Sequence, residues 1–309
     1  MPNYTIVGAG PVGRETARLL AAEGNEVRLV SRAGSAVPHV GVHSVSLDAR
    51  DGEGLARVAD GADAVFMCAM APYHKWPTEF PPLMSGVVSA SEKSGAPLVV
   101  LGNVYGYGDA APSPLTPSAP LAPTSEKGRV RKEMWEQALS SAVPALEVRA
   151  SDYIGDGAAS LFTLMTLPSL LRGEPAAVIG DPDALHAWSF TKDVAKTLVA
   201  ASRYGGEWGR SFFVPSHHIS VRDLVSKFVE YGHIAVAELK PLTDAELDHL
   251  AREDEIMREV VEMAYLYRQP SILDASDTER LLGVSASNLE IAVEDTVRNV
   301  DRSKNIGQV

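Results

Sequence analysis

A glycine-rich turn near the N-terminus limits the possible folds more strongly than any other segment. An apolar strand at 4–7 leads into the turn Gly8-Ala9-Gly10-Pro11-Val12-Gly13, a helical segment covers 14–23, and an apolar stretch at 27–30 follows. Strand, glycine turn, helix and strand within about 30 residues make a βαβ unit, the context in which such a turn binds a dinucleotide. The alternative is a glycine turn that binds no ligand.

Each glycine of this turn has a separate expected role. Gly8 permits the sharp turn from strand to helix, Gly10 lets the backbone approach a pyrophosphate, and Gly13 lets the helix pack closely on the sheet. The pyrophosphate would lie at the helix N-terminus, where free N–H groups and the helix dipole favour an anion. We therefore expect cofactor contacts from Gly8, Gly10, Pro11, Val12 and Gly13.

The end of the second strand indicates which dinucleotide is bound. NAD-binding units usually carry Asp or Glu there to hold the ribose diol, whereas this chain has Ser31 and Arg32. A guanidinium binds a 2′-phosphate that a carboxylate would repel, so we predict NADP, with NAD as the second choice. Arg32 is alternatively a solvated loop arginine. Arg14 either reinforces the phosphate site or is exposed beside Glu15.

Residues that follow three further strands are also expected to contact the cofactor. Asp48, after the third strand, either hydrogen-bonds the adenine amine or caps the next segment. Ala69 follows the fourth strand, and Ala150 and Ser151 follow the sixth. Ligands of open α/β sheets bind at these C-terminal strand ends, which is why the segments matter.

The rest of the chain alternates strands with helices, which predicts an α/β fold. Expected strands lie at 42–47, 64–68, 98–101, 146–149 and 212–214, and expected helices at 52–58, 83–94, 125–142, 160–172, 191–203, 220–231 and 243–264. This alternation predicts a Rossmann doubly wound parallel sheet, with a smaller, mainly helical C-terminal substrate domain. The 309 residues suggest about two domains. We assign 1–152 plus about 184–214 to the dinucleotide-binding domain, and about 153–183 plus 215–309 to the substrate domain.

Composition excludes several classes of function. With 28 basic and 40 acidic residues the net charge is −12, which argues against binding nucleic acid or an anionic membrane. The acidic excess is concentrated at 243–264, which we expect to be a solvated face of the second domain. The single Cys68 excludes a disulfide framework, no metal-ligand spacing occurs among the histidines, and no export signal is seen. We therefore predict a cytoplasmic protein without a metal.

Several ordered motifs are similar to one known family. They are the glycine turn, Asp48, Val104-Tyr105-Gly106 after the fifth strand, the run 149–155 after the sixth, the run 188–195 that opens a helix, and the C-terminal run 273–283. Together they resemble the extended and atypical short-chain dehydrogenase/reductases, the NAD-dependent epimerase/dehydratase group, over nearly the whole chain. The resemblance implies a Rossmann domain, a C-terminal substrate domain and an active site between them. In that family the helix at 126–139 often contributes to a dimer interface, so a homodimer is expected, with a purely intrachain contact as the alternative.

The family's proton relay is replaced in this chain. The resemblance implies a Tyr-x-x-x-Lys pair with a nearby Ser or Thr, but alignment places Lys127, Arg131 and Leu101 at these positions. None of the nine tyrosines has a lysine four residues later, so the pair is not merely displaced. Arg131 can hydrogen-bond a ribose but stays protonated. Lys127, Tyr105 or Tyr107 would handle the proton, and Lys127 would also touch the cofactor.

The remaining candidates follow strands or lie near the expected cleft, and each is alternatively a packing residue. As substrate contacts we expect Tyr73, Trp76, Asn103, Asp152, Tyr153 and Trp188. The proline-rich loop 109–123 is expected to cover the cofactor cleft, or else to be an inert surface loop. The sequence thus predicts an NADP(H)-dependent oxidoreductase or epimerase/dehydratase-like enzyme for a small carbonyl or hydroxyl compound. The alternative is a non-catalytic NADP-binding sensor of the same fold.

Overall fold

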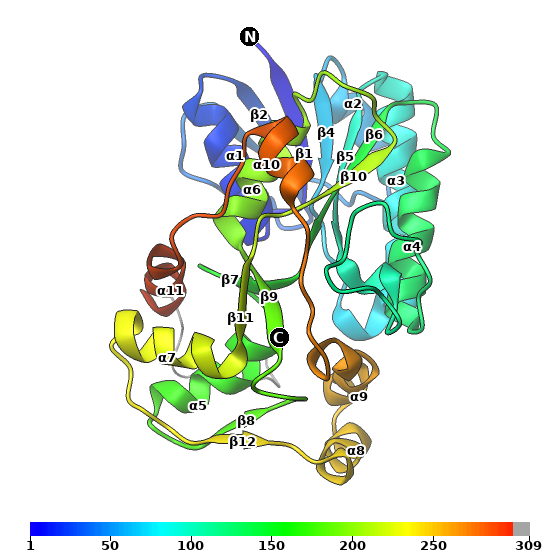
Figure 1. Ribbon diagram of the computed structural model, residues 1–309. Coiled ribbons are helices and arrows are strands. Elements are labelled where there is room, and N and C mark those ends of the chain that lie inside the picture. Colours follow the sequence, from blue (N-terminus) through cyan, green and yellow to red (C-terminus); the bar gives the residue numbers. More distant parts are fainter. Residues whose placement is uncertain (299–309) are drawn as a thin grey trace.

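A seven-stranded parallel sheet forms the centre of the larger half of the molecule (Figure 1). In the computed structural model, which describes residues 1–298, the strands are β1 (Asn3–Val7), β2 (Glu26–Ser31), β3 (Val42–Ser46), β4 (Ala64–Met67), β5 (Leu98–Asn103), β6 (Ala145–Ala150) and β10 (Arg210–Phe213). Their spatial order is β10-β6-β5-β4-β1-β2-β3, and every neighbouring pair is parallel. The predicted Rossmann doubly wound sheet is confirmed.

Helices cover both faces of this sheet, because its strands are apolar on both sides. One face carries α1 (Pro11–Ala22) and α6 (Thr191–Ala201), whose Leu20 and Leu198 are buried in one apolar cluster. The other face carries α2 (Gly52–Ala59), α3 (Trp76–Ser94) and α4 (Glu126–Leu139). Val130, Met134 and Ala138 of α4 are buried within this chain, so the apolar stripe of α4 packs on its own domain.

The order of the strands creates a crevice at the end of β1. From β1 the chain proceeds to β2 and β3 on one side, then returns to β4, β5 and β6 on the other. At such a switch point the loops after neighbouring strands diverge, which leaves room for a ligand at the C-terminal strand ends. The glycine turn follows β1 directly, so the fold places it at this crevice.

The smaller half has its own core and contains strands that the sequence analysis did not predict. Two small sheets are formed by β7 (Asp152–Ile154), β9 (Leu185–Phe190) and β11 (His217–Ser220), and by β8 (Ala176–Val178) and β12 (Leu239–Pro241). Its helices include α5 (Leu167–Leu171), α7 (Val221–Gly232) and α11 (Leu289–Arg298). Phe162, Trp188 and Phe228 lie in this second core. The two-domain division itself remains a proposal. One helix assigned to the second domain, α10 (Ser276–Leu282), packs on α6 and β10 of the larger half.

The predicted helix at 243–264 is two helices, α8 (Asp244–Glu253) and α9 (Glu255–Glu262). The expected capping box is present, since Thr243 and Glu246 satisfy each other's backbone N–H groups. Asp254 interrupts the helix because its backbone is extended and its carboxylate accepts hydrogen bonds from the N–H groups of Ile256 and Met257. A residue that caps the next helix cannot continue the previous one.

The proline-rich loop does not cover the cofactor crevice, contrary to the expectation from its length. Leu115 bridges to Leu273, and the carbonyl of Pro117 accepts hydrogen bonds from Tyr107 and Ser211 at the β10 edge of the sheet. Among residues 1–298, no helix combines the length and apolar character needed to cross a bilayer. The same residues contain no group of three or more acidic, histidine or cysteine side chains arranged to hold a metal.

Candidate active site

A cavity of about 280 Å³ lies at the C-terminal ends of β1, β2 and β4. Its walls are the glycine turn, the end of β2, the segment 47–50 and the segment 68–71. The expected residues Gly8, Gly10, Ser31, Arg32 and Ala69 all line it. The fold therefore brings together residues from four separate loops that the sequence analysis assigned to one cofactor.

The three glycines occupy different environments that match their expected roles. Gly8 has a φ of +111°, and a Cβ there would overlap the backbone of Ala69. A Cβ at Gly13 would overlap the carbonyl oxygen of Gly8, so this glycine is required for helix-to-strand packing. A Cβ at Gly10 would meet no protein atom within 4 Å. The space above Gly10 is therefore open to a ligand, which fits a pyrophosphate at the helix N-terminus.

The two residues between the glycines differ in exposure. Pro11 is exposed at the first position of α1, and Val12 is buried beneath it. Gly157, in the loop after β7, approaches Pro11 so closely that a Cβ there would lie 2.6 Å from Pro11 Cγ. The loop after β7 thus reaches the start of α1.

The adenosine end of the cavity carries a basic side chain without an acidic partner. Arg32 is exposed, lines the cavity, and forms no ion pair within residues 1–298. Asp48 lines the same cavity, but Arg50 binds its carboxylate, which together with a backbone hydrogen bond lowers the pKa of Asp48 to about 2. The expected adenine contact of Asp48 is therefore weakened, because its oxygens already have a partner. Sequence reasoning missed Arg50, although it lies only two residues after Asp48.

Arg131 is buried next to the cavity wall, where its guanidinium contacts Met70, and it forms no ion pair within residues 1–298. Its side chain is 6% exposed and donates to the Leu101 carbonyl at 3.3 Å. The guanidinium carbon lies 4.5 Å from the Trp76 ring centre and 4.7 Å from that of Phe80. Burial lowers the pKa of Arg131, and its Nε has no hydrogen-bond partner. A buried guanidinium with an unpaired donor fits a ligand oxygen such as a ribose hydroxyl.

Several tyrosine side chains lie around the Arg131 guanidinium. Burial raises the pKa of Tyr105, while the guanidinium of Arg131 acts to lower it. Burial likewise raises the pKa of Tyr153 to about 12, again opposed by Arg131. The Tyr73 hydroxyl is hydrogen-bonded to Tyr105. These phenols stay protonated at neutral pH, so they can donate a proton rather than accept one.

A buried carboxylate completes the group, and sequence reasoning missed both residues that hold it. Asp152 Oδ2 lies 2.7 Å from His186 Nε2 and also accepts a hydrogen bond from the Tyr267 hydroxyl. His186 is 3% exposed, stacks on the Tyr267 ring at 4.6 Å, and its Nδ1 has no partner. The three residues come from β7, β9 and the 3₁₀ helix at Ala264–Tyr267, so no local sequence pattern connects them.

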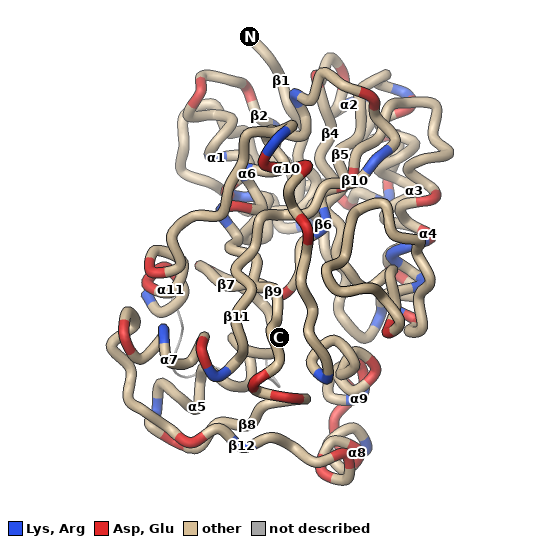
Figure 2. Tube along the Cα trace, viewed as in Figure 1, with Lys and Arg blue, Asp and Glu red and all other residues tan. Residues whose placement is uncertain are grey.

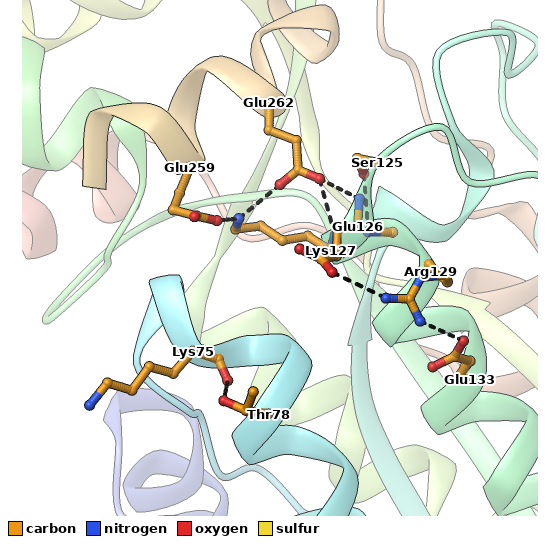
Figure 3. Close-up of polar contacts among 10 residues, drawn as sticks. Lys75, Thr78, Ser125, Glu126, Lys127, Arg129, Glu133, Glu259 and Glu262 are labelled. Carbon is orange, nitrogen blue, oxygen red and sulfur yellow. Dashed lines mark hydrogen bonds and ion pairs between the residues drawn. The ribbon is translucent and has the colours of Figure 1, made fainter. Parts of the chain in front are cut away.

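The expected role of Lys127 as proton donor and cofactor contact is not supported by its surroundings. Its side chain is 1% exposed, and Nζ donates to Glu259 and, at 2.9 Å, to Glu262 (Figure 3). Nζ also lies 4.6 Å from the centre of the Tyr73 ring. The ammonium group of Lys127 is therefore already paired with two carboxylates of α9. The expectation of a fully solvated acidic face at 243–264 is wrong for these two, although Figure 2 shows other acidic residues along α8 and α9.

Removing this ammonium group is expected to release α9. Lys127→Met leaves Glu259 and Glu262 facing each other without a counter-charge, and breaking a buried ion pair typically costs about 3–5 kcal/mol. We expect amide hydrogen exchange over 255–262 to accelerate by about tenfold or more while exchange in α1 is unchanged. Lys132→Met, which removes a half-buried lysine of the same helix that pairs only with Glu136, is the control. Unchanged exchange over 255–262 would contradict the role of Lys127 as an anchor.

Several other expected site residues have structural roles. Tyr107 is buried away from the cavity, where its hydroxyl contacts Arg149 and donates to the Pro117 carbonyl, so it is not available as a proton donor. Asn103 caps the 3₁₀ helix at Val104–Tyr107 by accepting from the Tyr105 N–H. Trp188 is fully buried and donates to the Ile219 carbonyl.

Three more expected contacts lie behind the walls of the crevice rather than on them. Trp76 is 2% exposed, donates to the Ala71 carbonyl, and supports Arg131. Ala150 is fully buried in β6, and the N–H of Ser151 donates to the Ser189 hydroxyl. A cofactor would reach these residues only through the backbone or after side chains move, so the expectation of direct contact is not supported for them.

Comparisons with known proteins agree with this fold and site. Residues 8–142 match the model of a family described as NAD(P)H-binding. No curated protein matches the chain. The Bordetella bronchiseptica enzyme WbmH, solved with NAD⁺, is 20% identical with a TM-score of 0.77, covering 97% of this chain and 98% of that one.

Two further solved structures are epimerases of similar length. The UDP-glucose 4-epimerase of Thermotoga maritima, solved with UDP-glucose, is 19% identical with a TM-score of 0.74, covering 96% of this chain and 98% of that one. The UDP-glucuronic acid 4-epimerase of Bacillus cereus, solved with NAD, is 14% identical with a TM-score of 0.75 and the same coverage.

These findings define the fold. The chain has the Rossmann fold that these solved epimerases share, so the predicted resemblance is confirmed at the level of the fold. At this level of identity the solved structures establish the fold alone. Residues 8–142 are the part of the chain that matches the NAD(P)H-binding model, and none of the nine tyrosines has a lysine four residues later.

Proposed function

We propose that this chain is an NADP(H)-dependent oxidoreductase or epimerase/dehydratase-like enzyme that acts on a small carbonyl or hydroxyl compound. The observation that carries the proposal is the buried guanidinium of Arg131, which contacts Met70 of the cavity wall and acts electrostatically on the phenol of Tyr105. Burial and the charge of Asp152 raise the pKa of Tyr105, and Arg131 opposes that rise, an arrangement that is common at catalytic sites. The Nε of Arg131 has no hydrogen-bond partner within residues 1–298, which supports a role toward a ligand.

Different residues would bind different parts of the cofactor. The turn at Gly8 and Gly10 would hold the pyrophosphate, Arg32 the 2′-phosphate, and Arg131 the hydroxyls of the nicotinamide ribose. The preference for NADP over NAD rests on Arg32, which forms no ion pair within residues 1–298, while the nearby Asp48 carboxylate is paired with Arg50. When bound, the nicotinamide ring supplies or accepts a hydride.

Tyr105 is the proposed source of the proton. Its phenol is protonated at neutral pH, and Arg131 stabilises the phenolate that remains after the proton has gone to a substrate oxygen. Arg131 would thus supply the positive charge that the lysine supplies in the family's Tyr-x-x-x-Lys pair. Tyr73, which is hydrogen-bonded to Tyr105, is a second phenol through which the proton can be returned. Leu101 offers only its backbone, and its carbonyl is already held by Arg131.

A second candidate is a cofactor-binding sensor without turnover. The observation that favours it is the ion pair of Lys127 with Glu259 and Glu262, which closes the position normally used for proton transfer.

We also propose a cytoplasmic location, which fits the single buried thiol of Cys68. A homodimer is proposed as well. Of the apolar residues along α4, Leu139 is exposed and could contact a second copy.

Turnover of NADPH with a panel of ketones, aldehydes and sugar nucleotides tests the proposed mechanism. Tyr105→Phe should lower turnover by about a hundredfold or more without changing NADPH affinity, because general acid catalysis contributes that much. Tyr231→Phe, on α7, is the control and should retain full activity. Full activity of Tyr105→Phe would contradict the assignment, and bound NADPH without turnover on any compound would favour the sensor.

A further inference from the structure

A second cavity, of about 720 Å³, lies at the β10 edge of the sheet, and it shares no lining residue with the cofactor cavity. Its walls are the proline-rich loop, the segment that leads into β10, the segment around the start of α10, and single residues of α4 and β6. The volume is in the range of small-molecule sites. We propose that this cavity binds an uncharged, polyhydroxylated small molecule with the chemistry of a free sugar.

The proline-rich loop is fixed in place and forms a preformed wall of this cavity. Leu115 exchanges backbone hydrogen bonds with the segment 272–274, which continues into the opposite wall. The carbonyl of Pro117 accepts hydrogen bonds from the hydroxyls of Tyr107 and Ser211. Segments that lie far apart in the sequence are therefore joined directly. A wall that is ordered before the ligand arrives lowers the entropy cost of binding.

A buried arginine lines the cavity and keeps one donor group free. Arg149 is 3% exposed, its Nε donates to Glu147 at 2.6 Å, and its Nη1 donates to the Tyr107 hydroxyl. Its Nη2 donates to no atom of residues 1–298. An unmade hydrogen bond of a buried guanidinium is costly, and a ligand oxygen in the cavity would complete it. Because Glu147 balances the charge of Arg149, the pair offers a directed donor without a net charge.

The charges around the cavity nearly cancel. Three basic and four acidic side chains line it or pair with a residue that does, which leaves a sum of −1: Arg149, Arg210, Arg280, Glu147, Glu207, Asp274 and Asp277. All three arginines are ion-paired, whereas Glu207 and Asp274 form no ion pair within residues 1–298. An anion would meet two unpaired carboxylates and a cation would meet three arginines, so the balance favours an uncharged ligand.

Aromatic rings and polar groups alternate on the walls. Trp135 and Trp208 both line the cavity, and the indole N–H of Trp208 is already bound to the Tyr204 carbonyl, which leaves the ring itself for a ligand. Indole rings offer flat apolar surfaces to C–H groups. The free donor of Arg149 and the free carboxylate of Glu207 complement hydroxyl groups, which donate and accept hydrogen bonds at once. A sugar carries both kinds of surface.

Ligand-observed NMR on the intact protein tests the proposal with the neutral sugars glucose, galactose and mannose. At least one should bind with a dissociation constant of about 10 mM or lower. The uronate and the amino sugar derived from the tightest of the three should each bind about threefold or more weakly, because a charged group loses hydration without gaining a free counter-ion. Binding of no neutral sugar at about 50 mM, or equal or tighter binding of either charged analogue, would overturn the proposal.

Two variants locate the bound sugar. Glu207→Ala, at an exposed position, should weaken the neutral sugar by about fivefold or more, the effect of one hydrogen bond to a charged group, without weakening the uronate. Ser118→Trp, at an exposed position on the loop, should fill the cavity and abolish binding. Glu230→Ala on α7 is the control and should change neither affinity. Unchanged binding in both Glu207→Ala and Ser118→Trp would place the sugar elsewhere and overturn the assignment of this cavity.

Discussion

Replacing Gly10 with alanine is expected to weaken cofactor binding by about tenfold to a hundredfold while leaving the stability of the free protein nearly unchanged. The structure separates these two effects. Gly10 has a φ of −73°, which any residue adopts, and an added Cβ would meet no protein atom within 4 Å. The methyl group would instead occupy the space where a pyrophosphate approaches the N–H groups at the start of α1.

Gly13→Ala is the contrasting variant, because there the added methyl group meets protein. The added methyl group would overlap the carbonyl oxygen of Gly8, which is a backbone atom of the tightly packed turn after β1. Forcing extra volume into such a contact costs about 1–3 kcal/mol or more, so the melting temperature of the free protein should fall by several degrees. Thermal unfolding and cofactor titration of both variants check the pair. Equal loss of stability in the two, or unchanged cofactor affinity in Gly10→Ala, would contradict the assigned roles.

Arg32→Ala is expected to have the second large effect, and only on one of the two cofactors. A guanidinium that grips a 2′-phosphate makes charge-assisted, bidentate hydrogen bonds, whose loss should weaken NADPH binding by about ten- to a hundredfold. NADH lacks that phosphate, so its affinity should change by less than about twofold. The selectivity between the cofactors should therefore collapse in the variant.

Titration of NADPH and NADH at two salt concentrations provides the measurement for Arg32→Ala. The exposed arginine should also make NADPH binding salt-dependent, because surface charges are screened. Arg18→Ala, which removes an exposed arginine on α1 that pairs with Glu15, is the control. Parallel loss of NADPH and NADH affinity in Arg32→Ala would show that Arg32 serves the fold or the general cofactor site, not the 2′-phosphate.

The Rossmann half was predictable from the sequence because its signals are local. Gly8, Gly10, Arg32 and Asp48 all lie shortly after strands, and a parallel sheet brings the C-terminal ends of its strands to one edge. Knowing the order of strands and helices was therefore enough to gather these residues at one cavity. Arg131 was also reached from the sequence, through the helix position that the family uses for its lysine.

The substrate half was less predictable because its contacts join distant parts of the chain. Lys127 meets Glu259 across 132 residues, and Tyr267 meets Asp152 across 115. No periodicity or motif connects such pairs, and composition alone suggested a solvated acidic helix where α9 in fact closes over Lys127. Tyr107 shows the opposite error, since a position after a strand suggested a site residue, whereas its hydroxyl is used to hold Arg149 and the proline-rich loop.

We propose that the cavity beside the glycine turn binds NADP(H) in preference to NAD(H). Direct titration of the unmodified protein with NADPH and NADH, followed by intrinsic tryptophan fluorescence or calorimetry, tests it without any assumption about substrate. The account predicts saturable binding of both cofactors with NADPH about tenfold or more tighter, corresponding to one charge-assisted contact to the 2′-phosphate. Equal affinities, tighter binding of NADH, or no binding of either cofactor would contradict it.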